Sequence, residues 1–439
     1  MNKLQTKISW KEIYSIALPA IAAGIAEPVI SLVDTAFVGQ LGTLELGAVG
    51  IGASFFTLIM WILAQTKSAI SAIVSKSFGA KTLYSLQSFV PQALTLNFLL
   101  GAFVFLGSYF LQDLIFEAYN AQGEQKELIK SYFSIRGWGL PISLVVFGIF
   151  GVFRGLQNTY WAMQISLVGM VTNIILDYLL IFGFGEIIPA FGIEGAAWAS
   201  VISQVIMLVL AIRFMLTKSK LKLDFTTKLH QGIRKLLKMS FDLFLRAAAL
   251  NLAFYFGTSF ATSYGENQIA AYTIGINIWL FSSFFIDGFS NAGNAIGGRL
   301  AGEGNLNELK RVGFLLVKVN IGIALMLSLV YLIFYTYLGR IFTQEAEVLR
   351  LFEASFWIII ISQPINALAF TLDGIFKGLG HTALLRNILI GAGVFAFLPA
   401  IFILDSFASN LFAIWFAFVL WMLARGLPLL FKFKNLKHV

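Results

Sequence analysis

Residues 30–39 read Ile30-Ser31-Leu32-Val33-Asp34-Thr35-Ala36-Phe37-Val38-Gly39 and place one carboxylic acid inside an apolar run. The run ends a hydrophobic segment that exceeds the length needed to cross a bilayer, about 20 residues. A charge in the bilayer interior costs about 3 kcal/mol or more unless it is neutralised, hydrated or paired. This stretch therefore predicts a membrane span that carries a functional acid.

The composition indicates an integral membrane protein. The 439-residue chain is 58% hydrophobic and 12% charged, against about 25% charged residues in soluble domains. It contains no cysteine, which excludes disulfides, thiol nucleophiles and cysteine-ligated metals. The sequence also lacks a nucleotide-binding loop, a nucleophile elbow and any metal-ligand spacing. We therefore expect neither an enzyme nor an ATP-driven pump, and no bound cofactor.

Outward from the opening stretch, the chain divides into twelve hydrophobic segments of spanning length. We predict an all-α membrane protein with spans at about 13–40, 46–78, 88–112, 128–153, 161–184, 192–217, 236–263, 268–299, 312–337, 348–376, 384–404 and 408–431.

The basic residues predict the orientation of these spans, because short cytoplasmic connections are enriched in lysine and arginine. With a cytoplasmic N-terminus, 24 of the 31 basic residues face inward and five, Arg136 among them, face outward. Lys67 and Arg246 fall within spans. Both termini are then cytoplasmic in a plasma (inner) membrane. The net charge of +9 reflects this topology, so we expect no nucleic-acid partner.

The two halves of the chain repeat at an offset of 223 residues. The shift places Gly151-Val152-Phe153-Arg154-Gly155-Leu156 on Gly374-Ile375-Phe376-Lys377-Gly378-Leu379. Six spans per half predict two lobes related by a pseudo-two-fold axis along the membrane normal. We assign residues 1–217 and 236–439 to the lobes and 218–235 to a cytoplasmic linker. A cleft between such lobes is typical of an alternating-access carrier. The same offset pairs Thr35 with Thr258, Phe37 with Phe260, Gly42 with Gly265, Gly52 with Gly275 and Gly79 with Gly302.

Three polar residues share one level in the first lobe. Asp34 and Asp177 each lie roughly 10 Å from the outer ends of their spans, at about 1.5 Å of rise per residue. Asn173 precedes Asp177 by four residues and therefore lies on the same helix face. Two acids and an amide at one depth can hold a proton or a small cation.

The basic residues within spans have other predicted partners. Lys67 lies at the depth of Glu27, and we expect a structural ion pair, although Glu27 could instead extend a proton path from Asp34. Asp34 and Asp177 then have no cation. Burial disfavours the charged form of a carboxyl group, so we expect such acids to load and release protons. The alternative is two acids held structurally by backbone or water.

In the second lobe, Arg246 and Asp287 share a level, and we expect them to form a structural buried pair. Asp242 precedes Arg246 by four residues and could join that network. Asp373 precedes Lys377 by four and predicts a local ion pair.

These residues resemble the multidrug and toxic compound extrusion (MATE) family, specifically its DinF-like branch. The likeness extends over nearly the whole chain. It rests on Ala17-Leu18-Pro19, Leu32-Val33-Asp34-Thr35-Ala36, Asn173-Ile174-Ile175-Leu176-Asp177, Gly195-Ala196-Ala197-Trp198-Ala199-Ser200, Asp242-Leu243-Phe244-Leu245-Arg246, Ile286-Asp287-Gly288-Phe289 and Leu372-Asp373-Gly374-Ile375-Phe376.

The resemblance implies twelve helices in two lobes and export of organic, often cationic, compounds by proton or sodium antiport. It assigns ion coupling to Asp34, Asn173 and Asp177, and a supporting hydroxyl to Ser200. Lys67 stands where the family commonly has an arginine, which keeps the charge.

We therefore expect a monomeric antiporter that exports small amphipathic or cationic organic substrates in exchange for protons, surrounded by membrane lipids. Sodium coupling is the nearest alternative. A flippase for lipid-linked precursors should carry several arginines toward its cavity, whereas only Lys67 and Arg246 are counted within spans. A membrane receptor is a third possibility, but it would not need two acids at one depth.

Overall fold

The architecture is helical throughout the part of the chain that the structure describes. This computed structural model describes residues 7–219, 221–225, 228–407 and 410–438. Residues 220 and 226–227 of the expected linker lie outside these ranges. Eleven helical segments are long and apolar enough to cross a membrane, and two helices bent by 42° make up a twelfth. The expectation of an all-α membrane protein with twelve spans is thus confirmed for the described residues.

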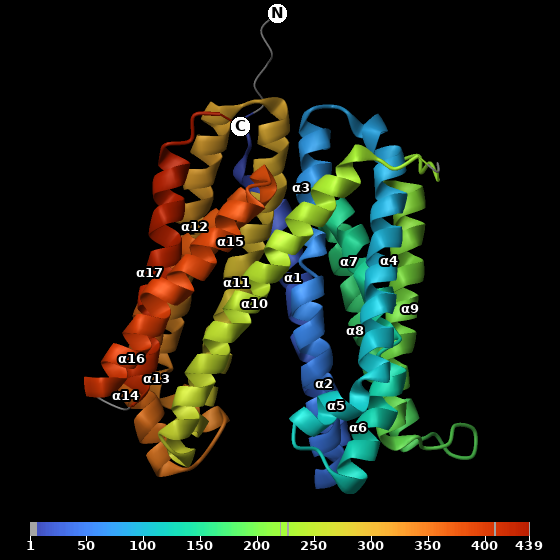
Figure 1. Cartoon of the computed structure of the whole chain (residues 1–439), viewed down its shortest axis with the longest axis vertical. Coiled ribbons are helices and arrows are strands. Elements are labelled where there is room, and N and C mark those ends of the chain that lie inside the picture. Colours follow the sequence, from blue (N-terminus) through green and yellow to red (C-terminus); the bar gives the residue numbers. More distant parts are fainter. Residues whose placement is uncertain (1–6, 220, 226–227, 408–409, 439) are drawn as a thin grey trace, which may run out of the picture. The chain divides into compact units, whose positions relative to one another are not determined.

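Contacts divide the chain into two compact units. Ala22–Ser240 form one, called here the N-unit, while Met1–Ile21 and Phe241–Val439 form the other, the C-unit. Helix α1 (Trp10–Val38) therefore begins in the C-unit and continues in the N-unit. The other N-unit helices (Figure 1) are α2 (Thr43–Leu63), α3 (Thr66–Gly79), α4 (Leu86–Phe110), α5 (Gln112–Ala118), α6 (Gly123–Arg136), α7 (Gly139–Gly155), α8 (Tyr160–Phe182) and α9 (Gly192–Lys218), with a short 3₁₀ turn at Leu83–Ser85.

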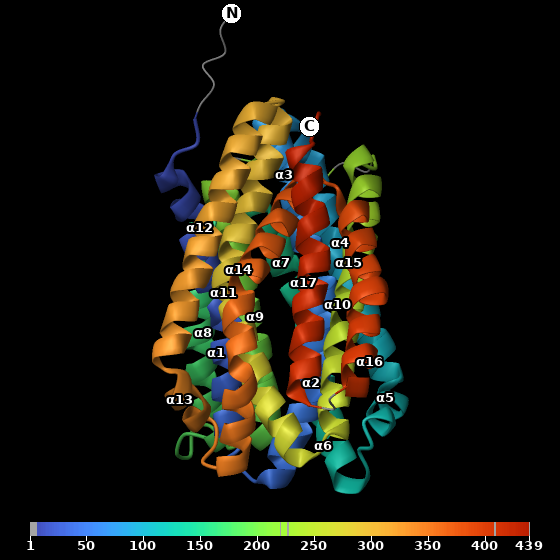
Figure 2. The ribbon, with the colours of Figure 1, turned by 90° about the vertical axis from the view of Figure 1, so that its left-hand side faces the viewer.

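The C-unit contains the remaining helices, several of which run side by side (Figure 2). They are α10 (Gln231–Ser263), α11 (Glu266–Glu303), α12 (Leu306–Ile333), α13 (Tyr335–Leu338), α14 (Ala346–Leu379), α15 (Thr382–Ala392), α16 (Leu398–Phe407) and α17 (Leu411–Lys434), with a 3₁₀ turn at Gly339–Ile341 and a π-helical segment at Gly393–Phe397.

Some spans run beyond the thickness of a bilayer or are interrupted. Helix α11 has 38 residues, about 57 Å at 1.5 Å per residue, and Gly304, with a φ of 67°, caps its C-terminal end. Glycine is favoured there because a side chain makes a left-handed backbone unfavourable. Helices α6 and α7 make up the bent span. The bend lies next to Arg136, the last residue of α6.

Glycines bring α7 against α3 in the N-unit. A Cβ atom at Gly151 would lie 2.6 Å from the Lys67 backbone oxygen, and one at Gly155 would lie 2.6 Å from Cβ of Val74. Such distances are too short for any side chain, so the two backbones approach closely only because these positions lack one. Small residues allow this close packing between membrane helices.

The repeated glycines have the same role in the C-unit, where they bring α14 against α11. A Cβ atom at Gly374 would lie 2.1 Å from the Ser290 backbone oxygen, and one at Gly378 would lie 2.2 Å from that of Asn294. Within its most apolar window, α14 is 67% buried, more than any other candidate span. The 223-residue repeat therefore corresponds to a repeated helix contact.

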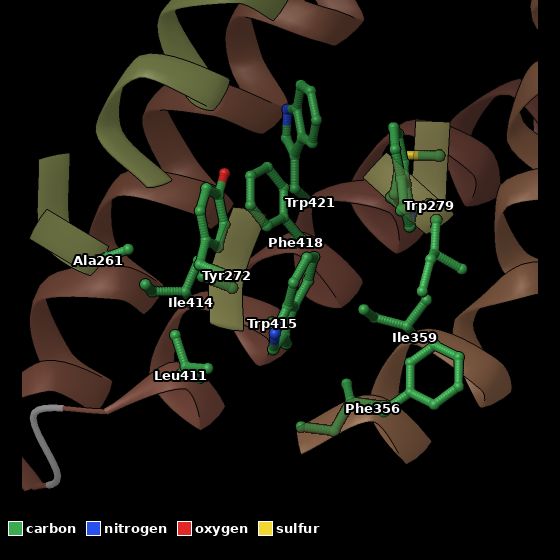
Figure 3. Packing of buried hydrophobic residues seen from close by; sticks show 14 of the residues in the cluster. Ala261, Tyr272, Trp279, Phe356, Ile359, Leu411, Ile414, Trp415, Phe418 and Trp421 are labelled. Atoms are coloured by element: carbon green, nitrogen blue, oxygen red, sulfur yellow. The ribbon is translucent and has the colours of Figure 1, made fainter. Parts of the chain in front are cut away.

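One hydrophobic cluster of the C-unit core is rich in aromatic residues. Figure 3 shows Trp415, Phe418 and Trp421 of α17 close to Tyr272 and Trp279 of α11. The Tyr272 and Trp415 rings stack with centroids 5.4 Å apart. This cluster packs the first half of α17, from Leu411 to Met422, against α11 and α14.

Polar contacts attach the start of α1 to the C-unit. Arg299 of α11 forms ion pairs with Glu12 and with Glu303. The Ile8 amide donates to Glu308 of α12 at 2.8 Å, and Arg311 donates to the Ile8 carbonyl at 2.9 Å. These bonds explain why the first turns of α1 group with the C-unit.

We predict that Gly378→Ala destabilises the protein by about 1–3 kcal/mol, the usual cost of overpacking a well-packed contact. The added methyl group would push α14 away from the Asn294 backbone of α11. Thermal unfolding in detergent, followed by circular dichroism, measures the effect. The matched control is Gly391→Ala in α15, where a Cβ meets nothing within 4 Å and the midpoint should hold or rise. Equal midpoints for the two variants would contradict the packing argument.

Candidate functional site

Two acids and an amide from α1 and α8 meet within the N-unit. With its amide nitrogen facing the acids, the orientation that satisfies its hydrogen bonds, Asn173 donates to Asp34 Oδ1 at 3.2 Å and to Asp177 Oδ2 at 3.3 Å. Asn173 and Asp177 are one turn apart on α8 and fully buried, whereas Asp34 is partly exposed. The structure thus brings together the three residues that the sequence placed at one depth.

The two carboxyl groups also interact with each other. A direct bond between two carboxyl groups requires a proton on one of them, because ionised carboxylates only accept. Asp177 Oδ1 is buried without a partner among the described residues. The site therefore offers a place for one proton between a partly exposed acid and a buried one.

The sequence did not predict the cation that lies near these acids. Arg136 ends α6, at the break of the bent span, and its positive charge acts on both Asp34 and Asp177. Position 136 falls inside the predicted span 128–153, and its expected outer location stays a prediction. Among the described residues, neither acid forms an ion pair with it. Arg136 therefore biases the site electrostatically without occupying the acids.

Other groups hold Arg136 in place. With its amide oxygen oriented toward the guanidinium, Gln204 of α9 accepts from Arg136 at 2.9 and 3.2 Å and from Ser143 at 3.1 Å. The guanidinium also lies 3.6 Å from the centroid of the Phe56 ring. A Cβ atom at Gly139 would lie 2.1 Å from Gln204, so this glycine leaves the space that the amide needs.

The other two predicted coupling residues are Ser200 and Glu27. Ser200 is buried in α9, and its hydroxyl has no partner among the described residues. Glu27 is exposed on α1, and the strongest positive charge acting on it is that of Lys67. The Lys67 ammonium lies 5.1 Å from the Phe147 ring centroid. The pairing of Glu27 with Lys67 stays a prediction.

In the C-unit the expected pairing of Arg246 with Asp287 is wrong. Arg246 instead forms a buried ion pair with Asp373 at 2.8 Å. The predicted pair of Asp373 with Lys377 is confirmed, also at 2.8 Å. Asp287 is exposed and accepts from Asn291 at 3.2 Å. Depth along a span did not show whether Asp287 or Asp373 pairs with Arg246. The partner depends on how each helix is rotated about its axis, which depth does not report.

Asp242 does not join the Arg246 network as expected. Its carboxylate binds Arg386 in an ion pair at 2.5 Å and accepts from the Thr382 hydroxyl at 2.9 Å. Both partners belong to α15. The count of two basic residues within spans is wrong too, since Arg425 is 2% exposed in α17 and Arg136 belongs to the bent span. The sequence does contain a signal for this residue, because Arg425 lies inside the aromatic-rich predicted span 408–431.

The described residues contain no group of three or more histidine, cysteine or acidic side chains that could hold a metal ion. The carboxyl oxygens of Asp34 and Asp177 can bind a proton or a small cation.

Comparison with known proteins gives one consistent family. The sequence profile of the MatE family matches residues 19–179 and again residues 243–402, once in each half of the repeat. The chain is 30% identical over 429 residues to protein DETOXIFICATION 44, chloroplastic, of Arabidopsis thaliana, covering 94% of this chain and 80% of that protein. It is 26% identical to DNA damage-inducible protein F of Escherichia coli, covering 95% and 91%.

Solved structures with the same fold include a Vibrio cholerae MATE transporter, with a TM-score of 0.90 at 20% identity over 97% of this chain and 96% of that one. An outward-facing multidrug resistance transporter matches with a TM-score of 0.87 at 22% identity, over 97% and 96%.

We predict that Asn173→Asp lowers stability by about 1–3 kcal/mol at about pH 8 and by less at about pH 5. The variant replaces the amide donor with a third carboxyl group, so like charges meet when all three ionise. Thermal midpoints at the two pH values measure the effect.

The control is Asn291→Asp, which adds a carboxyl group beside the exposed Asp287. Its midpoint should change little with pH beyond that of the wild type. A loss in Asn173→Asp that is equal at both pH values would show that the acids and the amide do not interact as described.

Proposed function

The chain belongs to the MATE family of multi-pass membrane transporters, and we propose that it exports small organic molecules in exchange for protons. In this proposal the membrane is the cell (inner) membrane, both termini are cytoplasmic and the transporter acts as a monomer. Members of the family are transporters and not enzymes, so the acids serve ion coupling rather than catalysis.

The observation that carries the proposal is the contact of Asn173 with both Asp34 and Asp177. A proton shared by the acids leaves one negative charge at the site, and its release leaves two. The second charge would be repelled by the first and attracted by Arg136. Because Asp34 is partly exposed and Asp177 is buried, Asp34 is the group that exchanges protons with the aqueous side.

Asp34 also lies on α1, the helix that begins in the C-unit. A change of charge at Asp34 would therefore act on a helix whose first turns are attached to α11 and α12. This gives protonation a mechanical connection to the other unit through the chain itself. Glu27, seven residues earlier on α1, is a second acid on this route.

Sodium is the alternative coupling ion. Sodium is a hard cation and binds oxygen ligands, as other hard cations do, whereas the Asn173 nitrogen faces both acids. In the orientation that satisfies its hydrogen bonds, the amide directs its nitrogen and not its oxygen at the acids, and this orientation supports the proton.

The number of arginines within spans does not exclude a flippase for lipid-linked precursors, because Arg136, Arg246 and Arg425 all belong to spans. The relatives favour export instead, since they include a probable multidrug resistance protein of Pasteurella multocida that is 24% identical over 392 residues.

We predict that an imposed pH gradient without sodium drives uptake of ethidium, a fluorescent organic cation, into proteoliposomes with the wild-type protein. Asp34→Asn keeps the shape of the side chain and removes the ionisable group, so the rate should fall by at least about tenfold, a loss of about 1.4 kcal/mol or more. The matched control is Asp287→Asn, which alters an exposed acid and should retain transport.

Transport by Asp34→Asn at the wild-type rate would overturn the role of Asp34. Transport by the wild type only after sodium is added would replace the proton by sodium as the coupling ion.

A further inference from the structure

Arg136 is held near the acid pair by groups that carry no charge. It ends α6, next to the 42° bend that leads into α7. Both of its terminal nitrogens donate to the Gln204 oxygen, at 2.9 and 3.2 Å, and the Phe56 ring centroid lies 3.6 Å from the guanidinium. No carboxylate in the described ranges forms an ion pair with it. Its positive charge therefore remains available to act on the acids nearby.

The packing of three helices places Arg136 at the level of the two acids. One hydrophobic cluster of the N-unit joins α1, α6 and α8 through Val38, Tyr132 and Ile181. Asp34 and Asp177 lie four residues before the cluster member of their helix, and Arg136 lies four residues after its own. Because α6 belongs to the fourth span, it runs opposite to α1 and α8, the first and the fifth. All three charged residues therefore lie one turn from the cluster on the same side.

The charge of Arg136 acts on both carboxyl groups and on Tyr132, which itself interacts with the acids. Two ionised carboxylates side by side attract any small cation. A cation that is already tethered beside them supplies part of that positive charge, so a further cation gains less free energy on binding. The side chain of Arg136 thus stands in electrostatically for a bound ion.

This loss of attraction affects sodium and the proton differently. A sodium ion is held by electrostatic attraction to several oxygen ligands, as other hard cations are, and Asn173 directs its nitrogen at the acids. A proton needs one oxygen atom, to which it binds covalently. Burial also favours the neutral form of a carboxyl group, whereas sodium has to give up its water. The tethered charge therefore removes sodium from the site and still allows a proton to bind and leave.

We propose that Arg136 determines the coupling ion, because it takes the electrostatic place of sodium beside Asp34 and Asp177 and leaves the site to protons. The inference rests on the proposed proton-coupled export and adds a residue that determines ion specificity. Gln204 is then a positioning residue that aims the guanidinium. Gly139 leaves room for it, since a Cβ atom there would lie 2.1 Å from the Gln204 oxygen.

The test measures sodium binding by the full-length protein in detergent. Thermal midpoints are compared in sodium chloride and in choline chloride at about pH 8, where protons compete little. A ion that binds only the folded protein raises the midpoint, and the wild type should show no rise specific to sodium. Arg136→Gln removes the charge, and Gln204→Glu neutralises it. Both variants should show a rise, with a sodium Kd at least about tenfold lower than that of the wild type.

The matched controls are Arg340→Gln and Gln344→Glu, which make the same two changes at exposed residues of the C-unit. Neither should respond to sodium. Arg136→Lys keeps the charge and should remain insensitive, as the wild type is. Adding Asp34→Asn to Arg136→Gln should abolish the rise, because one of the two carboxylates is lost. A purely structural role of Arg136 would lower the midpoint equally in both salts.

Two results would overturn the inference. One is a sodium-specific rise in the wild type as large as that in Arg136→Gln, and the other is no such rise in either variant. If Arg136→Gln does not fold, Gln204→Glu decides, because it retains the guanidinium and an acceptor for its hydrogen bonds. The wild-type measurement needs no variant at all.

Ethidium uptake in proteoliposomes under a pH gradient separates this inference from the proposed function. Uptake by the wild type, without a sodium response in the two variants, removes the role of Arg136 and leaves proton-coupled export standing. A sodium response in the variants alone, without pH-driven uptake by the wild type, does the reverse.

Discussion

The cost of placing charge inside an apolar, membrane-spanning fold is the constraint on which this structure depends. The N-unit meets it with an amide, since Asn173 donates to both Asp34 and Asp177. The C-unit meets it with cations, since Arg246 and Lys377 both bind Asp373. An amide leaves a carboxyl group able to change its protonation, whereas two bound cations hold a carboxylate ionised. The amide contact of the N-unit suits the binding and release of a proton, and the ion pairs of the C-unit suit a fixed, buried charge cluster.

Both arrangements rest on helix pairs that glycines bring into backbone contact. Gly151 and Gly155 allow α7 to approach α3, and the repeated Gly374 and Gly378 allow α14 to approach α11. Such a contact is rigid because each missing side chain is matched by a specific backbone atom opposite. Charged side chains near these contacts, such as Asp373, which directly precedes Gly374 on α14, are therefore held at defined positions.

The sequence predicts the features that depend on position along a helix. Apolar length predicted the spans, and the four-residue spacing of Asn173 and Asp177 predicted their common face. The pairing of Arg246 failed because depth does not report how a helix is rotated about its axis, which decides between Asp287 and Asp373. The contact of Arg136 with Gln204 was not predicted for a related reason: it depends on the bend between α6 and α7, which the apolar length of the span 128–153 does not report.

The polar centres are not repeated, although the helix contacts are. At the offset of 223 residues, the positions of Asp34, Asn173 and Asp177 correspond to Gly257, Ala396 and Ala400. Conversely, Asp373 and Arg425 correspond to Phe150 and Ile202. The duplicated fold thus keeps its packing glycines in both halves, whereas the positions of Asp34, Asn173 and Asp177 are polar only in the first half and those of Asp373 and Arg425 are charged only in the second.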